Sequence, residues 1–217
     1  MNRIITVKGI GTVKARPDLV LITLNIESQM YEYDQTMELA AKSVNQVISA
    51  IESIGFDKED LKTNDFNVRP HYEQYTDENN NYKNRFNGYL CEQNLTLAFD
   101  LDTKMISNVL NALAKTKVNP GLDIKFSIKD ETTISEELII QATKNAKRKA
   151  EILAQASGVS LGDLITIDYN WKDLPLFSPT NYNLSDRRLL REAQVPEIEP
   201  EEISVNDRAT FTWQIKS

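Results

Sequence analysis

The stretch Ile139 to Leu164 reads IIQATKNAKRKAEILAQASGVSLGDL, and it predicts a long helix followed by a sharp exit. Alanine recurs at every fourth position, at 142, 146, 150 and 154. Residues at this spacing lie in one line along a helix, so their methyl groups let a neighbouring backbone come unusually close. Ser157-Gly158 then supplies a helix stop, because glycine accepts positive φ, and a strand from Leu164 to Tyr169 is expected after it. The segment predicts a tightly packed helix that returns the chain to a sheet.

The N-terminal part of the chain predicts two strands and a helix. Apolar and polar residues alternate over Ile4–Val13 and Leu19–Ile26, and Arg16-Pro17-Asp18 between them favours a β-hairpin or a β-corner. From Asp34, a good N-cap, apolar residues recur at helical spacing as far as Gly55. This start predicts β-β-α.

A long hairpin is expected next. Thr63–Tyr75 and Arg85–Phe99 read as strands around the polar loop Thr76–Asn84, which predicts a projecting arm over residues 65–95. Cross-strand pairing explains part of its aromatic content, and the remainder predicts a partner surface, most simply another copy of the chain. The candidate oligomer interface consists of the six aromatic residues of the arm: Phe66, Tyr72, Tyr75, Tyr82, Phe86 and Tyr89.

The C-terminal half completes the expected fold. Asp102 caps a shorter helix, the strand Asp123–Lys129 follows, and the alanine helix starts near Thr133. Residues 172–202, rich in proline, are expected to form a long irregular surface excursion, and Ala209–Ile215 alternates as a last strand. The order β-β-α-β-β-α-β-α-β-β predicts an α+β fold in which helices cover one face of a largely antiparallel sheet.

Composition narrows the class of protein. The 217 residues contain 41% hydrophobic and 26% charged residues, which is typical of a globular chain, and a single domain over residues 1–217 is expected. The net charge of −7 argues against nucleic acid as a partner, and no apolar run reaches the ~20 residues of a membrane span. Residues 1–10 do not read as a signal peptide, so a cytoplasmic location is expected unless a leader was removed.

The residues that could carry catalysis are few. His71 is the only histidine and Cys91 the only cysteine, so no intrachain disulfide is possible. The predicted hairpin places position 71 opposite about position 89, and a Cys-His pair is arithmetically possible. A packing role for both is the better interpretation.

The other candidate motifs are also better explained structurally. Gly9-Ile10-Gly11 lacks the third glycine and the helix of a phosphate loop, so it predicts a bulge or a close backbone approach. The basic patch at residues 144–149 predicts a solvated helix face, and Asp57, Glu59 and Asp60 predict a turn. No catalytic, cofactor-binding or metal-binding residue and no cofactor is predicted.

Six short runs in order along nearly the whole chain carry a family resemblance. They are Ile5-Thr6-Val7-Lys8-Gly9-Ile10-Gly11, Pro17-Asp18, the run from Gly55-Phe56 through Asp60-Leu61-Lys62-Thr63 to Val68-Arg69-Pro70-His71-Tyr72, Gly88-Tyr89, the alanine helix with its exit, and Ile198-Glu199-Pro200. Together they resemble the SIMPL-domain family, whose members include periplasmic immunogenic proteins of bacteria. The chain departs from that pattern at Glu201-Glu202, where the family often has glycine, and in lacking the signal peptide of secreted members.

The resemblance implies oligomers and a loose association with stress defence or adaptor roles. The leading hypothesis is a non-enzymatic protein that self-assembles through the arm and the 172–202 excursion. One alternative is a small-molecule-binding protein or enzyme with a pocket between sheet and helices, and another is an envelope-associated antigen.

Overall fold

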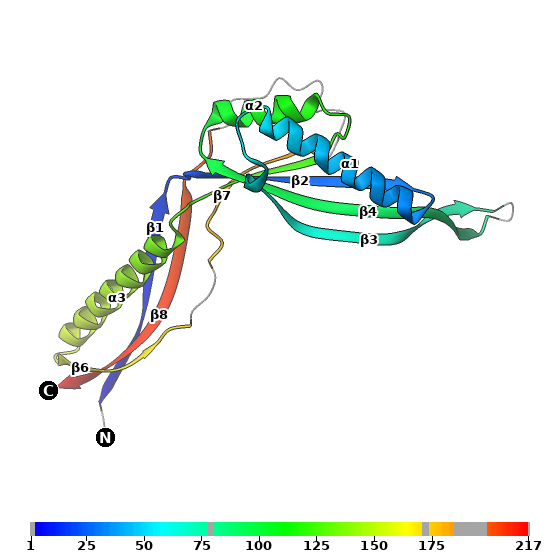
Figure 1. The fold of residues 1–217 in the computed structure, drawn as a ribbon. Helices are drawn as coiled ribbons and strands as arrows, with labels where there is room; N and C mark the ends of the chain where they lie inside the picture. Colours follow the sequence, from blue (N-terminus) through cyan, green and yellow to red (C-terminus); the bar gives the residue numbers. More distant parts are fainter. Residues whose placement is uncertain (1–2, 78–79, 171–173, 185–198, 217) are drawn as a thin grey trace. The chain divides into compact units, whose positions relative to one another are not determined.

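The computed structural model describes residues 3–77, 80–170, 174–184 and 199–216 (Figure 1). It has an α+β fold with the predicted order of elements, to which one further strand is added near the C-terminus. The elements are β1 Ile4–Ala15, β2 Leu19–Met30, α1 Tyr33–Glu52, the short 3₁₀ helix η1 Lys58–Asp60, β3 Leu61–Thr76, β4 Tyr82–Asp100, α2 Thr103–Ala114, β5 Gly121–Ser127, α3 Glu131–Ala156, β6 Ser160–Asp168, β7 Phe177–Leu184 and β8 Ile203–Lys216. Among the described residues, no helix is long and apolar enough to span a membrane.

The strands divide between two sheets. One has the order β1-β8-β6 and the other β3-β4-β2-β5-β7. The pairs β1–β8, β6–β8, β2–β4 and β3–β4 are all antiparallel. The chain folds as two compact units, the first containing β1, α3, β6 and β8 and the second containing β2 to β5 with α1 and α2. That the whole chain is one domain stays a prediction.

In the first unit, α3 lies against β1 at unusually short range. The four alanines of the predicted line, with Leu138, are the buried residues of this helix. A side-chain carbon at Gly9 would collide with the carbonyl oxygen of Ala142, and one at Gly11 with that of Leu138. Both predictions of close approach, one for the helix and one for the glycines, are therefore confirmed, and they describe the same contact.

The same helix closes the outer edge of β1. The Ile10 N–H donates to Asn145 Oδ1 (3.1 Å) and the Thr12 N–H to Gln141 Oε1 (3.2 Å). Lys149 Nζ donates to a β1 carbonyl (3.3 Å). A strand at the edge of a sheet otherwise offers unpaired N–H and C=O groups to other chains. Side chains one helical turn apart on α3 occupy these groups instead.

In the second unit, α1 and α2 cover one face of the five-stranded sheet (Figure 1). Alternate residues of β2 and β4 point to these helices, and they form one core with β5: Val20, Ile22, Leu24, Ile26, Val47, Ile51, Leu95, Leu97, Ile106, Val109, Leu110, Leu113, Leu122, Ile124 and Phe126. The opposite face of the sheet is polar, with Asn25 donating to Asn94 (2.9 Å) and an ion pair between Arg69 and Glu92 (3.2 Å). This alternation is typical of a sheet with one covered face.

Several local predictions need correction. Of the two alternatives predicted at residues 16–18, the hairpin is wrong, because β1 and β2 belong to different sheets, and the β-corner stays a prediction. The N-cap of α1 is Glu32, without a side-chain bond, and Asp34 lies in the first turn, where its charge complements the helix dipole. The 172–202 excursion contains β7, which extends the larger sheet beside β5, while residues 172–173 and 185–198 of that prediction lie outside the described residues.

Candidate functional site

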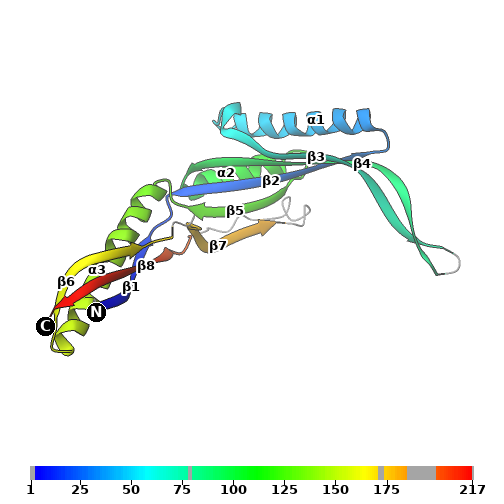
Figure 2. The same ribbon diagram turned by 90° about the horizontal axis from the view of Figure 1, so that it is seen from below.

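The predicted hairpin is confirmed, and its register defines the arm. Tyr72 lies opposite Phe86 and Tyr75 opposite Lys83, with irregularities between Thr63 and Asp65 and between Pro70 and Tyr72. Figure 2 shows the end of this hairpin extending beyond α1 and away from the rest of its sheet. The arm therefore presents side chains on both of its faces.

Five aromatic rings form a connected cluster at the base of the arm, which we call the aromatic face: Tyr31, Tyr33, Tyr72, Phe86 and Tyr89. The Phe86 ring centroid lies 5.4 Å from that of Tyr31, 5.8 Å from Tyr72 and 5.5 Å from Tyr89. Tyr33 lies 5.5 Å from Tyr89, and all four contacts are edge-to-face, a favoured aromatic geometry. Yet Tyr31 is 64% exposed and Tyr72 58% exposed. The cluster is ordered by its own contacts while much of its surface faces solvent.

The predicted interface residues divide between this cluster and other places. Tyr72, Phe86 and Tyr89 belong to the aromatic face. Tyr75 lies beneath the guanidinium of Arg85, whose Cζ is 5.7 Å from the centroid of the Tyr75 ring. The remaining two, Phe66 and Tyr82, are exposed.

Tyr31 and Tyr33 were not predicted from the sequence. The sequence signal for these two residues is the Tyr-Glu-Tyr run directly after β2. It indicates an aromatic cluster only once the β2–β4 register is known, because that register places Met30 opposite Tyr89.

β3 is one of the two edge strands of the larger sheet, and most of its length is exposed. Pro70, which has no N–H, and two register irregularities interrupt it. The charged residues Arg69 and Glu73 engage Glu92 and Arg85 of the neighbouring strand. Proline, bulges and charges are devices that discourage pairing of an edge with another chain. The arm is therefore suited to contacts through side chains rather than through its backbone.

The strand register does not pair the only histidine with the only cysteine of the sequence. Cys91 lies opposite Val68 on β3 and Ser28 on β2, whereas His71 lies beside the irregularity between Pro70 and Tyr72. Cys91 is fully buried, and burial, followed by the nearby Glu92 charge, raises the pKa of its thiol. A buried thiol with a raised pKa is a poor nucleophile. Cys91 therefore has the character of a core residue.

Among the described residues, no group of three or more His, Cys, Asp or Glu side chains is arranged to hold a metal ion. The acidic turn near residue 57 is a reciprocal capping box, in which Asp57 and Asp60 bond each other's backbone at η1. Asp102 caps α2 as predicted, accepting from the backbone N–H groups of Lys104 and Met105. These carboxylates have structural roles in starting helices.

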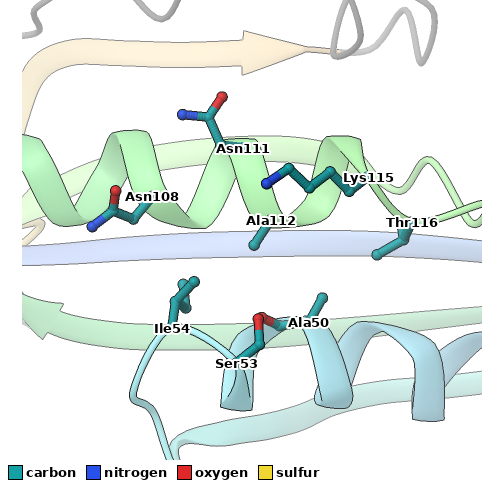
Figure 3. Close-up of a pocket in the computed structure, with 8 residues that line it drawn as sticks. All are labelled: Ala50, Ser53, Ile54, Asn108, Asn111, Ala112, Lys115 and Thr116. Atoms are coloured by element: carbon teal, nitrogen blue, oxygen red, sulfur yellow. The ribbon is translucent and has the colours of Figure 1, made fainter.

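A groove runs between α1 and α2, and we call it the α1–α2 groove. It consists of two adjoining cavities of about 590 and 840 Å³ that share Lys115 and Thr116. Figure 3 shows Ile54 pointing into the gap from the turn after α1 and Ala112 from α2, with the Lys115 side chain lying along α2 toward Asn111. The lining residues are Lys42, Asn45, Gln46, Ser49, Ala50, Ser53, Ile54, Asn108, Asn111, Ala112, Lys115, Thr116 and Lys117. The groove lies between the helices, whereas the alternative hypothesis placed a pocket between sheet and helices, where the apolar core lies.

Comparison with known proteins identifies the family. A family model described as "SIMPL: Protein of unknown function (DUF541)" matches residues 5–213. The chain belongs to the SIMPL family. The resemblance drawn from the six short runs is confirmed, and the SIMPL match extends over both compact units.

Three relatives of this SIMPL chain are informative. The 26 kDa periplasmic immunogenic proteins of Brucella melitensis biotype 1 and Brucella abortus are 28% and 27% identical to it over 163 residues, which is 75% of this chain. The aligned region spans 65% of the length of each Brucella protein, slightly less than two thirds. The uncharacterized protein YggE of Edwardsiella ictaluri is 20% identical over 166 residues, 76% of this chain and 67% of YggE.

Proposed function

We propose that this SIMPL protein is non-enzymatic and self-assembles through the aromatic face of its arm. The proposal rests on one observation: the rings of this cluster are held in place by one another, and yet their surfaces face solvent. Phe86 fixes three neighbouring rings by edge-to-face contacts, while Tyr31 and Tyr72 remain more than half exposed. Rigid aromatic side chains clustered on a surface are typical of protein interfaces, since they add contact area at little entropic cost.

A second copy of the chain is the partner that fits this surface best. The arm carries charges of both signs in short pairs, Lys83 with Asp77 (2.8 Å) and Arg85 with Glu73 (2.8 Å). A two-fold interface brings the same patch of both copies together, so it needs a self-complementary rim. Mixed charge around an apolar centre meets that need, whereas a rim of one sign would repel its copy.

We also propose an extracytoplasmic location, because the names of the two Brucella relatives describe periplasmic proteins. The expected cytoplasmic location finds no support among these relatives. A role in stress defence, an adaptor role and a role as an envelope-associated antigen stay predictions.

Light scattering on the purified chain tests self-assembly. We expect a mass above the 24.7 kDa of the monomer at micromolar concentration. The double variant Tyr72→Ser, Phe86→Ser should lower that mass, because it removes the centre of the aromatic face. The control Ile140→Ser, Ile152→Ser removes two exposed apolar side chains from α3 and should leave the mass unchanged. A monodisperse species of 24.7 kDa from the unaltered chain would contradict the proposal.

A further inference from the structure

The α1–α2 groove has a local charge opposite to that of the whole protein. The chain carries a net charge of −7, yet three lysines and no carboxylate line the groove. Within the part of the chain that the structure describes, Lys42, Lys115 and Lys117 form no ion pair. Three lysines that line one groove without an ion-pair partner provide a favourable potential for an anion.

The hydroxyl groups of the groove have a defined hydrogen-bonding role. Ser53 Oγ donates to the carbonyl of Ala50 and Thr116 Oγ1 to that of Leu113, both at 2.7 Å. With their protons engaged, these two oxygens can only accept a further hydrogen bond. The remaining donors are the lysine ammonium groups, the Ser49 hydroxyl and the side-chain amides, which come from Asn45, Gln46, Asn108 and Asn111. The groove thus offers donors for an anionic group and acceptors for hydroxyl groups.

The shape of the groove suits a small molecule. Ala50, Ile54 and Ala112 add an apolar strip where the helices approach, and short side chains keep the gap open (Figure 3). The two cavities, of about 590 and 840 Å³, are of the size that holds small ligands.

We propose that the α1–α2 groove binds a small hydroxylated phosphate ester, of the chemical class of sugar phosphates. Lysine binds phosphate as a point charge, and carboxamides and hydroxyl oxygens together recognise the hydroxyl groups of a polyol. The inference is independent of self-assembly, because none of the groove residues belongs to the aromatic face.

Calorimetric titration of the full chain with glucose 6-phosphate, inorganic phosphate and glucose tests this site. We expect glucose 6-phosphate to bind, inorganic phosphate to bind at least about tenfold more weakly, and glucose to give no measurable heat. The variant Lys115→Ala, Lys117→Ala should weaken glucose 6-phosphate binding by about tenfold or more, because two ammonium contacts are removed. The control Lys144→Ala, Lys147→Ala changes the net charge equally on the exposed side of α3 and should bind as the unaltered chain does.

Three results would overturn the proposal. They are absence of glucose 6-phosphate binding to the unaltered chain, equal weakening in the two lysine variants, and equal affinity for inorganic phosphate and the ester. Circular dichroism of each variant establishes that a loss of binding does not come from a loss of fold.

Discussion

β1 and β3 are both edge strands of antiparallel sheets, but the protein protects the two edges in different ways. The edge of β1 is closed by another element, since Gln141 and Asn145 of α3 accept from its backbone N–H groups. The edge of β3 is protected by its own sequence, through Pro70, charged side chains and register irregularities. The edge of β3 thus discourages pairing with another chain without a covering helix.

The difference shows where each unit is specialised. At Gly9 and Gly11 of β1, strand and helix lie so close that no side chain fits between them. Around β3, large aromatic side chains extend outward and few of its residues are buried. The first arrangement favours internal packing, and the second favours contacts with another molecule.

The largest effect is expected from separating α3 and β1. Gly9→Val should destabilise the protein by at least about 3 kcal/mol, because its side chain must displace the Ala142 backbone. Urea denaturation followed by circular dichroism measures the change. The control is Gly121→Ala, whose Cβ would meet Asn25 at an ordinary 3.6 Å and should change stability by less than about 1 kcal/mol. Equal midpoints for Gly9→Val and the unaltered chain would contradict the close contact.

A smaller effect is expected from the helix side of the same contact. Ala146→Leu should cost about 1 to 3 kcal/mol, since Ala146 is fully buried and extra methylene groups strain a packed core. The same substitution at Ala156, which is exposed near the end of α3, serves as the matched control in thermal unfolding. Tolerance of leucine at both positions would show that the alanine line faces solvent.

The closure of the β1 edge is expected to contribute less. Gln141→Met keeps the length and the helix propensity of the side chain but removes the acceptor for Thr12, and should cost about 1 kcal/mol. Gln155→Met, on an exposed position of the same helix, should be neutral. If both variants unfold alike, the helix does not contribute to protecting this edge.

The opposite edge of the first sheet gives the smallest effect, and only in alkaline solution. Tyr169 donates its hydroxyl proton to Asp207 (2.7 Å), and burial, followed by Asp207, raises the pKa of Tyr169 to about 12. Because the folded pKa lies above the usual value of 10, the stabilisation is complete below pH 10 and is lost as pH rises from 10 to 12.

In Tyr169→Phe, stability should therefore fall less between pH 10 and pH 12 than in the unaltered chain. Unfolding midpoints measured across this range provide the comparison. Parallel losses in the two proteins would show that the Tyr169 pair does not contribute.

The sequence predicts those features whose causes are local. The alanine line, the Asp102 cap and the arm follow from spacing and from turn chemistry within a few residues. The side chains that close the β1 edge could not be predicted, because Gln141 and Thr12 are far apart in the chain and meet only in the folded protein. For the same reason, the contact of Tyr31 with Phe86 could not be predicted from the sequence, because it depends on the pairing of β2 with β4.

The burial of Cys91 makes this residue a built-in kinetic reporter. It is the only thiol in the chain, and it lies in the sheet face that α1 covers, with no exposed surface. A thiol reagent can react only when this region opens, so the labelling rate follows the equilibrium population of the open form at low reagent concentration and the rate of opening at high concentration. Without any engineered probe, the dependence of the alkylation rate on denaturant separates local opening around α1, which exposes little surface, from unfolding of the whole chain.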